Sequence, residues 1–190
     1  MRMPLFLLFM IWFAPLEAQS KNITPADFSH CKADEAWWVG VRFKATNKEI
    51  LGLPVNEISK DWKFASLLMK ESIPRQYLFE GGSDVLKTSH LAFSKHSTFT
   101  NSGKKELALV GVYEKVDGKS GSFVLVLQER PGGHWKKLYV YTWNEPGFLA
   151  IDTQGSGFTV WFCMECDGHQ SFEWDKRKLT FNAITEPDED

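Results

Sequence analysis

The stretch ELALVGVYEKVDGKSGSFVLVLQER, from Glu106 to Arg130, holds two apolar segments joined by a short polar connection. Val, Leu, Phe and Tyr dominate both segments, which favours extended strands over Glu106–Lys115 and Ser122–Arg130. The connection DGKSG is rich in residues that tolerate the backbone angles of tight turns. It is too short to carry a crossover helix, so the two strands are predicted to pair antiparallel.

The same alternation of strand and turn patterns continues on both sides of this stretch. Further strands are predicted at His90–Phe99, Trp135–Trp143, Phe148–Asp152, Phe158–Cys166, Gln170–Asp175 and Leu179–Ile184. We therefore expect a mainly β fold, an antiparallel meander of about eight strands in which each strand lies beside its predecessor. Such a meander has to be barrel-like, sandwich-like or a partial propeller in order to protect its edges.

The segment before the meander mixes helix and strand patterns. Thr24 and Pro25 have the N-cap and first-turn chemistry of a short helix that ends near Cys31. Residues 36–43 alternate like a strand, and residues 59–72 predict a helix that Pro74 stops. We therefore expect a single mainly β domain over residues 19–184, with an α+β part over 19–82 and the meander over 90–184.

Two parts of the predicted meander resemble a known repeat. Thr100–Lys115 joins a polar glycine turn to an acidic residue and an apolar strand, and Ser171–Phe181 is a hairpin with Trp-Asp at its turn. Both are similar to parts of FG-GAP or VCBS-type β-propeller blades, which implies a β-meander. The matching positions Thr98, Thr100 and Ser102 hold no carboxylate, so the calcium loop of those repeats is not implied here.

The N-terminal residues have the pattern of a targeting signal, and the C-terminal residues are acidic. Residues 1–18 have a basic start, an apolar run and a small residue at Ala18, which is typical of a secretory signal peptide. We therefore expect an exported protein, periplasmic or secreted, that has no membrane contact after cleavage. Residues 185–190 form an acidic tail. The chain has 22 basic and 24 acidic residues and no basic stripe, so nucleic acid is not an expected partner.

Three cysteines, Cys31, Cys163 and Cys166, are disulfide candidates in an exported protein. A two-residue turn at Asp167-Gly168 would pair Trp161 with Trp174 and point Cys163 and Cys166 to opposite faces of a hairpin. Three interpretations stay open. Cys31 could pair with a strand cysteine, Cys163 could pair with Cys166 across a bulge, or Cys163, Cys166 and His169 could bind zinc together with His30 or Cys31.

No short catalytic motif and no cofactor motif is present in the sequence. The candidates for a binding surface are Trp37, Trp38 and Trp135 with the neighbouring His134, because exposed aromatic residues often mark such surfaces. We expect a non-enzymatic protein that recognises another protein, as an inhibitor or an immunity-type partner. The alternatives are a β-barrel that binds a small ligand or glycan, and an enzyme with a dispersed hydrolytic site.

Overall fold

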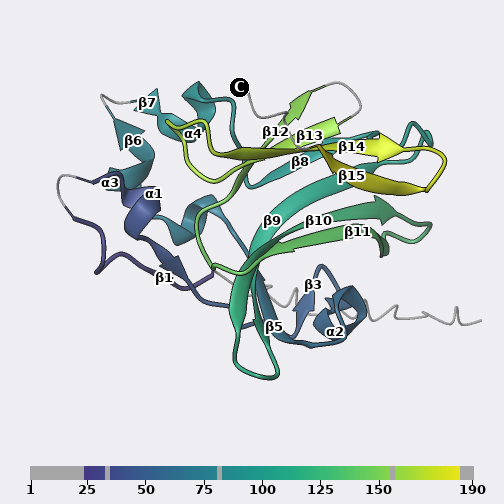
Figure 1. Cartoon of the computed structure of the whole chain (residues 1–190), viewed down its shortest axis with the longest axis horizontal. Helices are drawn as coiled ribbons and strands as arrows, with labels where there is room; N and C mark the ends of the chain where they lie inside the picture. The colour runs from purple at the N-terminus through teal and green to yellow at the C-terminus, as the bar shows by residue number, and fades with distance from the viewer. Residues whose placement is uncertain (1–23, 33–34, 81–82, 155–156, 185–190) are drawn as a thin grey trace, which may run out of the picture.

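The computed structural model describes residues 24–32, 35–80, 83–154 and 157–184, and its centre is an antiparallel five-stranded sheet (Figure 1). β9 (Glu106–Lys115) pairs with β10 (Ser120–Glu129), with Val110 opposite Val124, as the apolar pattern of these segments predicts. β11 (Trp135–Trp143) adds to the outer side of β10. The other side of β9 pairs with both β5 (Trp62–Leu67) and β8 (Ser94–Ser97).

The second sheet is a four-stranded meander in chain order. It consists of β12 (Ala150–Gln154), β13 (Gly157–Trp161), β14 (His169–Asp175) and β15 (Thr180–Ile184). Each strand pairs antiparallel with the next, and Phe158 lies opposite Phe172. Residues 150–184 therefore follow the predicted meander.

The two sheets face each other across an aromatic core, which makes the fold a sandwich (Figure 1). The ring of Tyr139 on β11 lies 5.4 Å from that of Phe181 and 6.0 Å from that of Phe172, both on the second sheet. The mainly β prediction is confirmed. Its strand order is corrected, because the chain changes sheet between β11 and β12 and the described strands do not close into a barrel.

The other face of the five-stranded sheet is also buried. Alternate side chains of β9 and β10, such as Leu109 and Leu125, pack there with Trp62 and with Ile58 of α2 (Val55–Ile58). Because both faces of β9 and β10 are covered, the two strands are apolar at nearly every position rather than at every second one.

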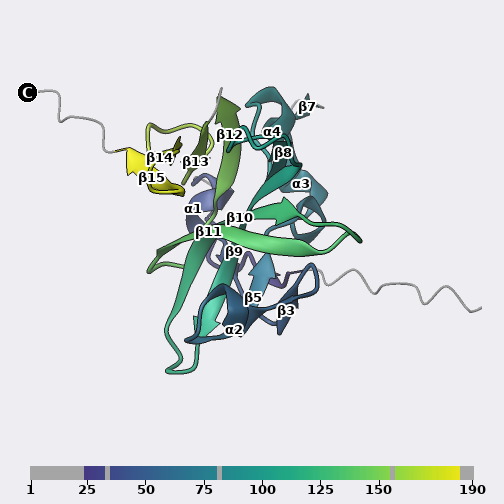
Figure 2. The same cartoon turned by 90° about the vertical axis from the view of Figure 1, so that its right-hand side faces the viewer.

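Short elements before β8 cover one side and one end of the sandwich (Figure 2). They are β1 (Ala26–Asp27), α1 (Trp37–Gly40), β2 (Arg42–Phe43), β3 (Glu49–Ile50), β4 (Leu53–Pro54), the 3-10 turn η1 (Lys70–Ser72), α3 (Arg75–Leu78), β6 (Phe79–Glu80), β7 (Ser83–Asp84) and α4 (Val85–Thr88).

Three local predictions in this part are wrong. The helix predicted over residues 59–72 is replaced at its centre by the strand β5, which hydrogen-bonds to β9 and also to Asn47 through both backbone groups of Ala65. The helix predicted from Thr24 is β1 and a turn. The strand predicted over residues 36–43 begins instead as the helical turn α1. Tertiary hydrogen bonds and burial outweighed the local helical period of segment 59–72.

The signal peptide and the acidic tail lie outside the described residues, so both stay predictions. Within the described part of the chain, no helix combines the length and the apolar character that a membrane crossing requires.

Candidate binding groove

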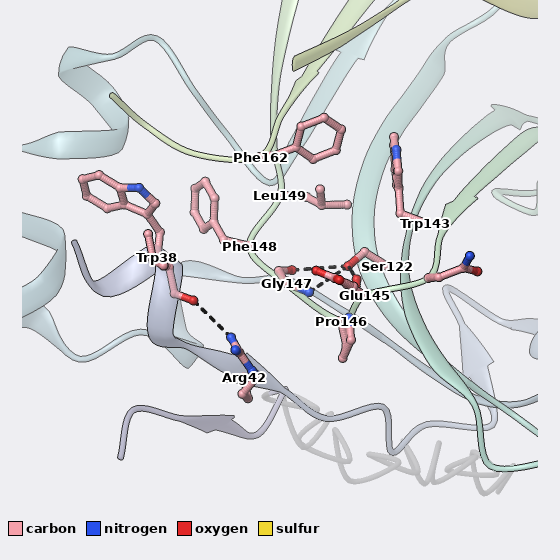
Figure 3. Close-up of a pocket in the computed structure, with 12 residues that line it drawn as sticks. Trp38, Arg42, Ser122, Trp143, Glu145, Pro146, Gly147, Phe148, Leu149 and Phe162 are labelled. Atoms are coloured by element: carbon pink, nitrogen blue, oxygen red, sulfur yellow. Dashed lines mark hydrogen bonds between the residues drawn. The ribbon is translucent and has the colours of Figure 1, made fainter. Parts of the chain in front are cut away.

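An open groove of about 900 Å³ lies where the chain passes from β11 to β12 (Figure 3). Trp38 and Trp143 stand on opposite sides of it, and Phe148, Leu149 and Phe162 lie between them. The remaining lining residues are Val39, Arg42, Ser122, Asn144, Glu145, Pro146 and Gly147. We call this feature the aromatic groove.

The helical turn α1 separates two adjacent tryptophans. Trp37 is 7% exposed, and its ring contacts Phe148 edge-on at 5.5 Å, so it belongs to the core. Trp38 stays half-buried and lines the groove. Gly40 at the end of the turn has no room for a side chain, because a Cβ there would lie 2.8 Å from the Cα of Cys31. Close packing against the preceding segment therefore fixes where Trp38 stands.

Ser122 at the start of β10 holds the floor of the groove in place. It is 1% exposed; its Oγ accepts a hydrogen bond of 3.0 Å from the Gly147 N–H and donates one to the Glu145 carbonyl (Figure 3). These bonds satisfy backbone groups of the irregular segment that links the two sheets. They fix the position of Phe148 and Leu149, which are almost completely buried.

The loop from Phe162 to Gly168 forms one wall, and here the predicted hairpin register is wrong. Trp161 pairs with His169 rather than with Trp174, so β13 ends before the cysteines. The loop is closed by a bond of 3.0 Å from the Phe162 N–H to the Gly168 carbonyl and by a disulfide between Cys163 and Cys166, whose Cα atoms are 5.8 Å apart. A paired strand would point these cysteines apart, whereas the compact loop brings them together.

The cysteine alternatives are thereby decided in favour of the local pair. Cys31 is a free thiol that donates a weak hydrogen bond to the Trp37 carbonyl, and burial raises its pKa. The predicted zinc ligands Cys163 and Cys166 are bonded to each other and cannot act as thiolates. In the ranges that the structure describes, no group of three His, Cys, Asp or Glu side chains is placed to hold a metal ion.

His169, the third predicted zinc ligand, has other contacts. Its ring lies 4.7 Å from that of Trp161, and its Nδ1 is 2.8 Å from the Asp167 carbonyl. The side chain therefore packs at the base of the disulfide loop.

Charged side chains of both signs lie at the rim of the groove. The Arg42 guanidinium donates to the Val39 and Val41 carbonyls, at 3.1 Å in each case, which satisfies carbonyls at the end of α1. Glu145 is exposed on the β11–β12 connection. A ligand in the groove would thus meet apolar surface in the middle and both charge signs at the rim.

A smaller hollow of about 280 Å³ adjoins Trp38, which lines both cavities. Tyr77, Met164 and Glu165 are among its other lining residues. The disulfide loop therefore contributes Phe162 to the groove and Met164 to this hollow.

The four residues predicted for a binding surface are not brought together. Trp38 lines the groove and, together with Trp37, the smaller hollow, while Trp135 and His134 lie at the far end of β11, where the Trp135 ring is 6.5 Å from that of His96. Sequence reasoning missed Trp143 and Phe162, which it assigned to strands, and Arg42 and Glu145. The turn NEPG, directly after Trp143, was the available signal that this strand end lies at the surface.

Three comparisons with known proteins found no matching family model, no matching curated protein and no matching solved structure. The resemblance of two segments to propeller blades stays a prediction.

Proposed function

We propose that this chain is an exported, non-enzymatic binding protein whose aromatic groove takes an extended segment of a partner protein, as an inhibitor or immunity-type partner would. The observation that carries the proposal is the pair Trp38 and Trp143 on opposite sides of an open groove with Arg42 and Glu145 at its rim. Trp and Arg are the residues most enriched among those that dominate protein interfaces.

The shape of the groove supports an extended ligand. Small-molecule sites usually enclose most of the ligand surface, whereas this groove is open and adjoins a second hollow at Trp38. A peptide segment with one large apolar side chain would bury that side chain against the half-buried Trp38, Trp143 and Phe162. Charged groups beside it would then meet the opposite charges of Arg42 and Glu145.

The disulfide agrees with the proposed export. Disulfides persist in oxidising compartments and are rare in the cytosol, and Cys163–Cys166 stabilises a wall of the groove. Cleavage of residues 1–18 and the choice between periplasm and exterior belong to the proposal.

A glycan is the second candidate, because the two half-buried tryptophans offer flat apolar faces to the C–H groups of a sugar. The barrel mouth predicted for such a ligand is replaced by the groove between α1 and the β11–β12 connection. Neutral oligosaccharides should then bind and peptides should not.

The test uses two exposed valines as a matched pair. Val39, 60% exposed, lines the groove, and Val116, 71% exposed, lies in the β9–β10 turn. Random peptides displayed on phage are selected for binding to the wild-type protein. The Kd values of the selected peptides are then measured by calorimetry for the wild type, V39D and V116D. We expect V39D to weaken binding at least tenfold and V116D less than twofold.

Equal effects of the two substitutions would place the peptide outside the groove and reject the proposal. Selection of no peptide, together with V39D-sensitive binding on an array of neutral glycans, would favour the second candidate.

A further inference from the structure

A third cavity, of about 440 Å³, lies at the opposite end of the β10–β11 pair and has a different chemistry. Its lining comes from the loop before β9, the adjoining ends of β10 and β11, and the β14–β15 turn. The residues are Thr100, Ser102, Gln128, Lys136, Lys137, Leu138, Trp174, Lys176 and Leu179. We call it the basic pocket.

Within the described residues, two of the three lysines in this lining make no ion pair and no hydrogen bond through their ammonium groups. Lys137 donates to the Glu57 and Ile58 carbonyls at 3.1 and 2.7 Å and so caps the end of α2. Lys136 and Lys176 are exposed and pair with no carboxylate in the part of the chain that the structure describes. Two unpaired ammonium groups beside one hollow attract an anionic group.

The opposite end of the five-stranded sheet is built differently. There each lysine near the β9–β10 turn lies beside a carboxylate, with Nζ–O distances of 2.8 Å for Lys115–Asp61, 3.2 Å for Lys119–Asp117 and 3.7 Å for Lys63–Glu114. The charges of these three lysines are thus partly neutralised by a neighbouring carboxylate, unlike those of Lys136 and Lys176.

Two of the four acidic groups near the pocket, Glu106 and Asp175, are already engaged. Glu106 is completely buried, and its carboxylate accepts hydrogen bonds from Thr100, Ser102 and Gln128. Asp175 accepts from the Arg177 and Lys178 N–H groups at 2.8 and 3.1 Å. These bonds take up the carboxylate oxygens and leave Lys136 and Lys176 for a ligand.

The excess of positive charge extends beyond the lining. The segments 101–106, 128–138 and 173–179 carry eight basic and four acidic residues, although the whole chain has 22 basic and 24 acidic ones. This local field favours the approach of anions at low ionic strength.

The rest of the lining suits a sugar. Trp174 is half-buried, with one contact to the Phe181 ring at 5.1 Å, and it contributes an indole to the pocket. The electron-rich face of an indole attracts polarised C–H groups. The donors of Thr100, Ser102 and Gln128 are directed at Glu106, but the Thr100 hydroxyl oxygen and the Gln128 amide oxygen can still accept hydrogen bonds from sugar hydroxyls. We propose that the basic pocket binds an acidic saccharide, with Lys136 and Lys176 on its carboxylate or sulfate group and Trp174 on its ring.

The experiment measures Kd by calorimetry for tetragalacturonate, a heparin tetrasaccharide and neutral maltotetraose. The variant K136Q/K176Q is compared with K48Q/K119Q, which removes the same charge from exposed lysines elsewhere, and with W174A. Thermal unfolding checks that W174A is folded. We expect at least one acidic saccharide to bind, K136Q/K176Q to weaken it at least tenfold, K48Q/K119Q to weaken it less than twofold, and maltotetraose not to bind.

Binding of the galacturonate alone would identify carboxylate as the recognised group, and binding of the heparin fragment alone would identify sulfate. Three results would overturn the proposal. The first is that none of the saccharides binds, and the second is that K136Q/K176Q and K48Q/K119Q lose equal affinity. The third is that octaglutamate or a 12-nucleotide single-stranded DNA binds more tightly than the acidic saccharides, with an affinity that W174A does not change. The V39D variant should bind the saccharide like the wild type, so failure here and failure of the aromatic groove are distinguishable.

Discussion

The two ends of the same pair of strands carry opposite kinds of surface. At one end Ser122 on β10 lies opposite Trp143 on β11, beside the aromatic groove, and at the other Gln128 lies opposite Lys136, beside the basic pocket. Six residues of strand separate Ser122 from Gln128, or about 20 Å. The strands supply a common frame, and the loops attached at each end determine what that end can bind.

The two ends are also held together by different chemistry. A covalent bond between Cys163 and Cys166 closes the loop that carries Phe162 into the aromatic groove. At the basic pocket, the buried Glu106 carboxylate accepts hydrogen bonds from Thr100 and Ser102 in the loop before β9. A substitution that disrupts one end should therefore leave ligand binding at the other end unchanged.

The largest effect is expected from Glu106→Ala. The substitution leaves the Thr100 N–H and the Thr100 hydroxyl, both partly buried, without their acceptor, and each such loss costs about 1–3 kcal/mol. We expect the free energy of unfolding to fall by about 3 kcal/mol, since two or more donors are affected. Urea denaturation measures the loss, and amide exchange at Thr100 localises it.

Peptide binding in the aromatic groove should survive Glu106→Ala under conditions where the variant is folded. Loss of peptide binding in a folded variant would show that the two ends do not behave independently.

A smaller effect is expected from C163S/C166S. The disulfide closes a very short loop, for which the chain-entropy estimate is about 2 kcal/mol. We expect the unfolding free energy to fall by that amount or less, and peptide affinity to fall several-fold because Phe162 is no longer held. Acidic saccharide binding in the basic pocket serves as the control and should stay within twofold of the wild type. An unchanged peptide affinity would mean that the hydrogen bond between Phe162 and Gly168 is sufficient to hold the loop.

The smallest effect is expected from protonation of Asp175 at low pH, which should loosen the β14–β15 turn. Hydrogen bonds from the Lys178 and Arg177 N–H groups lower the pKa of Asp175. Its ionised form therefore favours the folded turn, and this contribution is present above about pH 4. It is lost as the pH falls through the lowered pKa of the folded protein. NMR titration of the Arg177 and Lys178 amides should show the turn loosening at acid pH in the wild type.

Asp175→Asn keeps the shape of the side chain and cannot ionise, so the same amides should lose that pH response. A similar acid transition in both proteins would assign the effect to another group. The aromatic groove should show no change in either protein over this range.

Sequence reasoning succeeded where local pattern and tertiary environment agree. β9 and β11 have the predicted bounds, because apolar strand formers and turn residues alternate clearly there. It failed for residues 59–72, where a helical spacing of apolar residues hides a strand whose hydrogen bonds go to β9 and Asn47. It failed also at Asp167-Gly168, because a strong two-residue turn signal does not reveal the disulfide that makes the loop longer.

The candidate sites were less predictable than the strands. Trp38 was predicted as a binding residue, but Trp143 on β11 and Phe162 in the loop after β13 are far away from it in sequence. The basic pocket gave no signal at all, because its lysines are scattered over three segments and the net charge of the chain is −2.

The mainly β class, the bounds of β9 and β11 and the approximate positions of the other strands from β8 to β15 follow from the amino-acid sequence alone, because strand propensity and turn chemistry act between near neighbours in the chain. Only the tertiary structure decided the change of sheet after β11, the pairing of Cys163 with Cys166, and the separation of aromatic and basic surfaces to opposite ends of β10 and β11. These features depend on contacts between residues distant in sequence, and such contacts form only when the two sheets bury their shared core.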